Sequence, residues 1–292
     1  MSSESHPPVD LLVVGHVTLD LVEGRSLPGG AAYYAARAAS GLGLRVGVVT
    51  SWGVDFSHRS ALAGLSVAVR PAAQSTCFEN RYRATGRQQR LCGLAEPLGI
   101  EDIPETWRSA PALYLCPVMG EVSLDLSASL PGMVALGAQG WMRRVGPQGR
   151  VLSQVWRPSM ASLERVRMVV LSDEDAAGDP GIVSHLAERV SLVAYTHGER
   201  GCELFEKGTR HWVEAHPADE VDPTGAGDVF GVVLLAALSR GWSSVQAARL
   251  AAAAASVVVE GRAGQALDRI DEAWRRLSLL QRMAGDDGLP AW

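Results

Sequence analysis

Glu220-Val-Asp-Pro-Thr-Gly-Ala-Gly-Asp228 is the stretch that decides the fold and chemistry of this chain, and a long apolar run over residues 229–238 follows it directly. Its small residues predict free main-chain amides at the N-terminus of a helix, where amides and helix dipole together hold negative charge. Phosphoryl transfer needs such a preorganised set of donors. Asp228 then lies where it can accept the proton of an attacking hydroxyl, although a lone aspartate in a first helical turn is also common.

Short apolar runs recur along the rest of the chain, separated by segments that predict helices. A glycine-punctuated helix over residues 31–42 lies between the first two runs. Repeated alternation of strand and helix predicts an α/β fold with a mostly parallel central sheet and helices on both faces. The runs occupy residues 10–15, 45–50, 112–116, 133–136, 168–171 and 192–196.

Residues 75–94 break this rhythm, because polar and apolar residues alternate around Ala84-Thr-Gly86. The pattern predicts an antiparallel hairpin with one solvated face, which we interpret as a small lid. We therefore expect a single domain over residues 1–285, with a lid formed mainly by residues 75–94. Residues 286–292 are expected to form a flexible tail.

Bulk properties narrow the class of protein. The 292 residues are 47% hydrophobic and carry a formal net charge of −5, which gives no general attraction to nucleic acid or anionic membranes. No run approaches the roughly 18 apolar residues of a membrane span, and we expect a cytoplasmic protein that binds neither nucleic acid nor membrane. The four cysteines lack zinc-site spacing.

Asp222-Pro-Thr-Gly-Ala-Gly-Asp228 resembles the Asp-Thr-x-Gly-Ala-Gly-Asp signature of the PfkB/ribokinase-like carbohydrate kinase family, with Pro223 in place of the first threonine. The resemblance implies a ribokinase-like fold and transfer of the ATP γ-phosphate to a hydroxyl of a small polyol, a sugar or an inositol-like cyclitol. It assigns Asp228 as the catalytic base and Thr224 to the cofactor. The anion hole is assigned to Gly225, Ala226 and Gly227.

Further segments resemble the acceptor-binding elements of the family, in the family's order. Gly15-His-Val-Thr-Leu-Asp20 and the pair Gly29-Gly30 are similar to its substrate-binding motifs, but Tyr34 replaces the usual asparagine. Gly137 lacks the carboxylate of the family's Asp-x-Asn element. The expected substrate-binding residues are Asp20, Gly29, Gly30, Tyr34, Glu79 and Asn80. Because residues 20–29 are too few for the family's usual lid strands, we expect the hairpin at 75–94 to cover the acceptor alone.

The donor side is also implied by the resemblance. Ser172 and Asp175 correspond to the Asn-x-x-Glu element that organises magnesium through water, and oxygen ligands suit this ion. Thr196-His-Gly-Glu-Arg-Gly201 resembles the phosphate loop. The expected cofactors are ATP and Mg²⁺, with a monovalent cation left open. The expected cofactor-binding residues are Thr196, Gly198, Arg200, Gly201, Thr224 and Gly261.

Two alternatives stay open, and a third is disfavoured. A nucleoside kinase of the same fold is one, because Tyr33, Tyr34 and Phe78 could form an aromatic platform for a base. A non-catalytic nucleotide- or sugar-sensing homologue is another, since fold alone does not determine turnover. A dinucleotide-binding oxidoreductase is disfavoured, because Gly15 to Asp20 lacks the Gly-x-Gly-x-x-Gly spacing. Monomer and homodimer are both compatible with the sequence.

Overall fold

A computed structural model of the chain describes residues 6–83, 86–284 and 292. A nine-stranded sheet forms its centre, with the strand order β15-β14-β13-β12-β9-β8-β1-β4-β5. All pairings between β13 and β5 are parallel, and only the edge strands β14 and β15 pair antiparallel. This confirms the predicted α/β class. The strands are β1 Leu11–Val14, β4 Val46–Trp52, β5 Ser66–Pro71, β8 Ala112–Leu115, β9 Met133–Gly137, β12 Val166–Ser172, β13 Leu192–Thr196, β14 Cys202–Glu206 and β15 Thr209–Val213.

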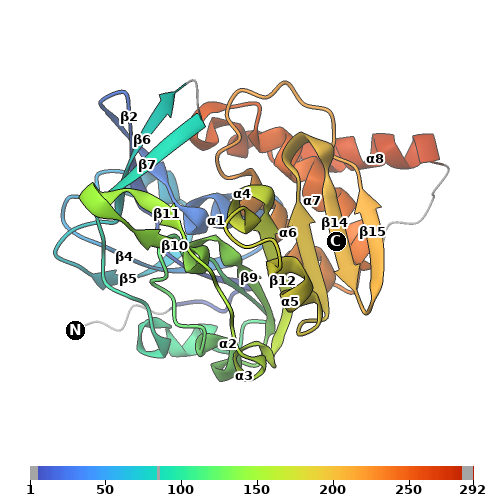
Figure 1. The fold of residues 1–292 in the computed structure, drawn as a ribbon, viewed down its shortest axis with the longest axis horizontal. Helices are drawn as coiled ribbons and strands as arrows, with labels where there is room; N and C mark the ends of the chain where they lie inside the picture. The colour runs from blue at the N-terminus through green and yellow to red at the C-terminus, as the bar shows by residue number, and fades with distance from the viewer. Residues whose placement is uncertain (1–5, 84–85, 285–291) are drawn as a thin grey trace.

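Helices cover both faces of this sheet (Figure 1). On one face lie α1 Ala31–Gly41, α6 Ala226–Ser239, α7 Ser244–Val258 and α8 Glu272–Ala284. On the other lie α2 Leu126–Ser129, α3 Met160–Leu163 and α5 Ile182–Ala187, while α4 Asp173–Ala176 follows β12. Short 3-10 turns span Arg59–Leu62, Ile100–Asp102, Glu105–Trp107, Ala138–Met142, Pro147–Gly149, Gly198–Arg200 and Arg262–Arg269.

The central helix α6 is apolar all round because it is buried all round. Residues 229–238 are all buried, and apart from Gly231 each is at most 7% exposed. The alanine run of α7 lets this helix pack closely, and Ala251, Ala253 and Ala254 are fully buried. Close packing on α1, α7 and the sheet fixes the direction of α6, and with it the position of its N-terminal residues.

The lid is a second, four-stranded sheet in the order β3-β2-β6-β7. Its strands are β2 Thr18–Val22, β3 Arg25–Gly29, β6 Cys77–Arg83 and β7 Gly86–Gly93, and it stands at the upper left of Figure 1. The hairpin predicted over residues 75–94 is present. A small hairpin, β10 Arg143–Val145 with β11 Val151–Ser153, reaches the lid through a bridge between Arg90 and Arg150.

The expectation that this hairpin covers the acceptor alone was wrong. Residues 18–29 form an antiparallel pair that joins β6 through β2. Residues 18–29 suffice for two strands because the turn between the strands takes only two residues, Glu23 and Gly24, whose φ angles are +51° and +77°. Such a turn matches the twist of the two strands and needs no longer loop.

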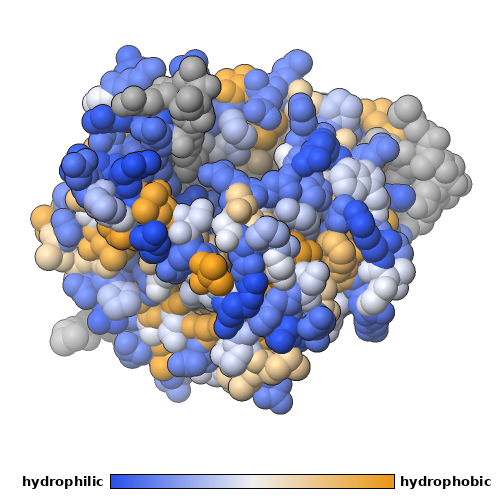
Figure 2. Space-filling view, viewed as in Figure 1, coloured by the Kyte–Doolittle hydropathy of each residue, from blue (hydrophilic) through white to orange (hydrophobic). Residues whose placement is uncertain are grey.

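Most of the expected flexible tail lies outside the described residues. Trp292, the exception, packs against Trp242 and Trp274 and donates a hydrogen bond to the Leu42 carbonyl at 2.7 Å. Hydrophilic residues predominate on the face shown in Figure 2, and its hydrophobic residues are mostly dispersed. Within the described part of the chain, every helix is too short or too polar to cross a membrane.

Candidate active site

The N-terminus of α6 carries Asp228 in its first turn. The preceding turn is held by Asp222, whose carboxylate accepts hydrogen bonds from the amides of Thr224 at 3.0 Å and Ala263 at 3.1 Å. The Ala226 amide is committed to this turn, because it donates to the Pro223 carbonyl. Among the described residues, none accepts a hydrogen bond from the amides of Gly225 or Gly227. These two amides are available to an anionic ligand.

Tyr34 holds this helix terminus from the side of α1. Gly225 has a φ of +85°, and a Cβ atom there would collide with the ring of Tyr34. Tyr34 as a whole is only 2% exposed. Burial raises the pKa of Tyr34 well above its usual value, and the charges of Asp20, Asp222 and Asp228 add to the effect. The residue that replaces the family's asparagine thus forms a wall around the predicted anion hole.

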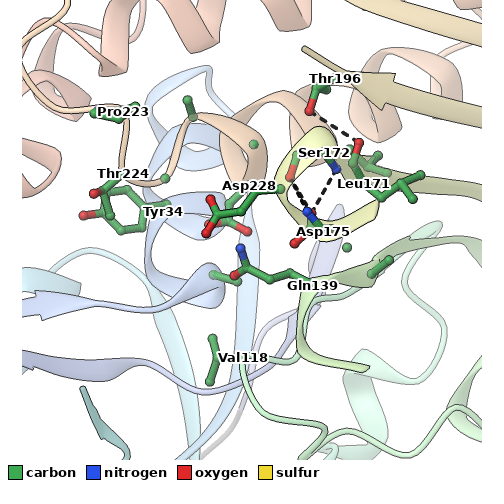
Figure 3. Close-up of a pocket in the computed structure, with 18 of the residues that line it drawn as sticks. Tyr34, Val118, Gln139, Leu171, Ser172, Asp175, Thr196, Pro223, Thr224 and Asp228 are labelled. Atoms are coloured by element: carbon green, nitrogen blue, oxygen red, sulfur yellow. Dashed lines mark hydrogen bonds between the residues drawn. The ribbon is translucent and has the colours of Figure 1, made fainter. Parts of the chain in front are cut away.

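Asp228 faces a cavity of about 470 Å³ at the carboxyl ends of the central strands, where open α/β sheets bind ligands. In Figure 3, Asp228 and Gln139 extend into this space from opposite sides. Of the predicted site residues, the cavity brings together Asp20, Gly30, Tyr34, Ser172, Asp175, Thr196, Gly198, Thr224, Gly225, Ala226, Gly227 and Asp228.

Ser172 and Asp175 form a capping box at the start of α4. The Ser172 amide and hydroxyl both donate to Asp175 Oδ2, at 2.9 and 2.8 Å, and Figure 3 shows these bonds at the cavity edge. Asp173 and Glu174 also line the cavity, but no cluster of three metal-ligating side chains occurs in the described part of the chain. This donor set fits magnesium, which keeps several waters and binds through one or two carboxylates together with substrate phosphates.

The predicted phosphate loop is tied to this acidic element by side-chain contacts. Asp173 accepts hydrogen bonds from His197 Nδ1 at 2.9 Å and from Arg200 at 2.6 Å. Burial alone would raise the pKa of Asp173, but hydrogen bonds from Tyr195 and His197 and the charge of Arg200 outweigh it and lower the pKa. Arg200 itself lines neither this cavity nor the second one. Its guanidinium anchors the loop to α4 in this arrangement.

The lid contributes residues from its inner face. Asp20 accepts a hydrogen bond from the Thr18 hydroxyl at 2.8 Å. Gly29 does not line the cavity but makes room for Asp20, because a Cβ at Gly29 would lie 2.6 Å from the Asp20 carboxyl carbon. Asn80 is 6% exposed, and its side-chain oxygen accepts a hydrogen bond from Gln89, which lines the cavity.

Glu79 is not brought to the cavity. Successive strand residues face opposite sides of a sheet, and the Glu79 carboxylate lies on the outer face with Arg81, at 2.8 Å, and Arg90, at 3.7 Å. Glu79 and Asn80 are adjacent, so they cannot share a face. The alternating pattern of the hairpin sequence already indicated this, because Asn80 shares a face with Phe78, two residues before it, and not with Glu79.

A second cavity of about 430 Å³ adjoins the first. Its walls are mostly small and apolar, from α6, α7 and the segment after β15, and include Ala215, Pro217, Phe230, Ala252, Ala255 and Val259. Thr196, Gly198, Pro223, Ala226 and Gly227 line both cavities. Gly201 lines only the second, and Gly261 lines neither.

Several lining residues were missed as individual site residues. Gln139, Arg143, Tyr114 and Val118 reach the first cavity from the ends of β8 and β9 and the segments that follow them. Position after a buried strand was the signal available for Gln139 and Val118. The sequence carried no comparable signal for Tyr114, which lies within an apolar run.

Comparisons with known proteins identify the family of this chain. The sequence profile of the pfkB family carbohydrate kinases matches residues 174–270. The chain is 28% identical over 263 residues to the cytidine kinase of Thermococcus kodakarensis, covering 83% of this chain and 93% of that protein. It is 32% identical over 267 residues to an inositol 3-kinase of Oryza sativa subsp. japonica, covering 83% of this chain and 66% of that protein. The chain belongs to the pfkB family of carbohydrate kinases.

Solved structures place this pfkB family member in the ribokinase fold. A pyrophosphate-dependent kinase of the ribokinase family, complexed with a pyrophosphate analog and myo-inositol, superposes with a TM-score of 0.76 at 23% identity, over 90% of this chain and 99% of that chain. A nucleoside kinase of Methanocaldococcus jannaschii gives a TM-score of 0.70 at 18% identity, over 94% of this chain and all of that chain. The protein is therefore a phosphotransferase with an alcohol group as acceptor.

Proposed function

We propose that this pfkB kinase transfers the γ-phosphate of ATP to a hydroxyl of a small polyol, a sugar or an inositol-like cyclitol, with Asp228 as the base. One observation carries the proposal: the two cavities share the residues around the N-terminus of α6, so that a donor in one and an acceptor in the other meet beside Asp228. Reactants held at one point gain most of their rate from proximity and orientation.

In the proposed mechanism, Asp20 accepts hydrogen bonds from acceptor hydroxyls and turns one of them towards the phosphoryl group. Asp228 takes the proton of that hydroxyl as its oxygen bonds to the γ-phosphorus and the bond to the ADP oxygen breaks. The amides of Gly225 and Gly227 hold the charge on the phosphoryl oxygens. Bound beside Ser172 and Asp175, magnesium would neutralise phosphate charge.

The base is tested by turnover of the Asp228→Asn variant. We expect ADP release stimulated by myo-inositol, D-fructose, D-ribose or cytidine in the wild type, measured with ATP and Mg²⁺. The variant should lose about 10²- to 10⁴-fold in kcat, the usual contribution of a general base, and should still bind ATP in calorimetry. If the two proteins release ADP at equal, measurable rates, Asp228 is not the base. If neither protein releases ADP, the result favours the sensing alternative.

The second cavity supports ATP rather than pyrophosphate as the donor. This cavity has a volume of about 430 Å³, and its walls beyond the residues shared with the first cavity are mostly apolar. Such a space suits a nucleoside, whereas a bare diphosphate would leave the apolar walls without a partner. We expect Ala255→Trp to fill this space and raise the KM for ATP about tenfold or more, with the acceptor KM unchanged as the internal control. Faster turnover with pyrophosphate than with ATP in the wild type would overturn this assignment.

A nucleoside acceptor is the second candidate, supported by Phe78. This lid residue is 3% exposed and lines the acceptor cavity, where its ring could stack on a base. Similarity to a cytidine kinase points the same way. Comparison of kcat/KM for cytidine and myo-inositol decides between the two. If cytidine is preferred and Phe78→Leu removes that preference, the proposal of a polyol acceptor is wrong.

A further inference from the structure

Tyr114 is a buried polar residue that the proposed mechanism does not use. It lies on β8 in the middle of the central sheet and is only 1% exposed. Its ring belongs to the hydrophobic core, yet the residue also lines the cavity that Asp228 faces. Because the ring is packed in the core, the hydroxyl end is the part that reaches the cavity.

Two glycines locate this hydroxyl. A Cβ atom at Gly137, the last residue of β9, would lie 2.8 Å from the Tyr114 oxygen. A Cβ at Gly231 would collide with the same oxygen. Gly231 follows Asp228 by three residues on α6, so the two positions are neighbours on one helix face. The phenol oxygen therefore lies between the end of β9 and the first turns of α6, close to the proposed base.

No described residue forms a hydrogen bond with the Tyr114 hydroxyl, although nearly all of the residue is buried. The hydroxyl that reaches the cavity thus makes no bond within the protein, and phenylalanine would fill almost the same space without it. Burial raises the pKa of Tyr114 well above its usual value, and the charges of Asp228, Cys116 and Asp175 add to the effect. At neutral pH the phenol is thus protonated and can donate a hydrogen bond.

We propose that Tyr114 is a further substrate-contacting residue, whose neutral hydroxyl donates a hydrogen bond to an oxygen of the acceptor bound beside Asp228. The inference rests on the proposed function for the identity of the ligand. The acceptor is favoured over the donor because Tyr114 lines the cavity that Asp20 and Phe78 close from the lid, and does not line the second cavity. Glycine at positions 137 and 231 leaves the space that the phenol occupies.

The experiment compares wild type with Tyr114→Phe, using whichever of myo-inositol, D-fructose, D-ribose and cytidine gives the fastest turnover. We expect kcat/KM for that acceptor to fall about tenfold, the effect of one hydrogen bond, with the KM for ATP unchanged. The ligand-free variant should melt at the same temperature as wild type or higher, because no protein hydrogen bond is lost. A lower melting temperature, an unchanged kcat/KM or a raised KM for ATP would each overturn the proposal.

A double-mutant cycle tests the position of the hydroxyl without any ligand. Gly137→Ala should lower the melting temperature of wild type, because the new methyl group meets the Tyr114 oxygen, and should lower that of Tyr114→Phe much less. Additive effects would place the hydroxyl elsewhere and refute the inference. Asp228→Asn, assayed in parallel, separates the role of Asp228 as base from the role of Tyr114 in acceptor binding. If this variant keeps its activity, the proposed base is wrong, but the Tyr114 measurements are still valid.

Discussion

The floor of the candidate active site, residues 222–228, and the lid, the four strands β2, β3, β6 and β7, both contribute residues to one cavity but are built differently. On the floor, one contiguous stretch supplies both the free amides and Asp228, held by Asp222 and the ring of Tyr34. In the lid, Asp20, Phe78 and Gln89 come from three separate strands. In the proposed mechanism, phosphoryl transfer thus depends on local backbone geometry, and acceptor selection depends on strand pairing.

Among the substitutions that test this comparison, Gly225→Ala on the floor is expected to have the largest effect. The new Cβ would collide with the buried ring of Tyr34, and φ of +85° is strained for alanine. We expect the free energy of unfolding to fall by about 2 kcal/mol and kcat to fall about a hundredfold, because a misplaced site loses catalysis steeply. Chemical denaturation and steady-state kinetics measure the two effects.

Gly227→Ala is the matched control for stability. A Cβ there meets nothing within 4 Å, and its backbone is helical, so the free energy of unfolding should stay equal or rise. If the two variants unfold alike, the contact between Tyr34 and Gly225 does not hold the floor.

Asp20→Ala is the corresponding substitution in the lid. Loss of the carboxylate should raise the acceptor KM about tenfold to a hundredfold, the value of hydrogen bonds to a charged group. The KM for ATP and the free energy of unfolding should change little. Thr18→Val, which removes only the hydroxyl that orients Asp20, should have a smaller effect in the same direction. A larger effect on kcat than on KM would assign Asp20 to the floor's chemistry instead.

The smallest predicted effect compares the lid neighbours Asn80 and Glu79. Asn80→Ala releases Gln89 from its hydrogen bond and should raise the acceptor KM by about threefold to tenfold. Glu79→Ala removes a carboxylate from the outer face and should leave this KM within about twofold, since exposed ion pairs contribute little. Equal effects would show that the two lid faces are not distinct in solution.

Much of the fold followed from local pattern. The strand runs, the helix after Gly30 and the hairpin at 75–94 were predictable because burial imposes a period on each element. The pairing of residues 18–29 with that hairpin was not, since a two-residue turn at Glu23 and Gly24 carries a weak local signal and strand neighbours are set by tertiary contacts. Arg200 was expected at the cofactor, and only the fold revealed its bond to Asp173.

By itself, the sequence indicated the family and the proposed chemical centre, because the predicted anion-binding turn and the candidate base lie within seven consecutive residues, 222–228, whose conformation is local. Only the tertiary structure decided what surrounds that centre. Tyr34, Gln89 and Tyr114 come from segments far apart in the chain, and whether their polar atoms face core, solvent or cavity depends on packing between elements.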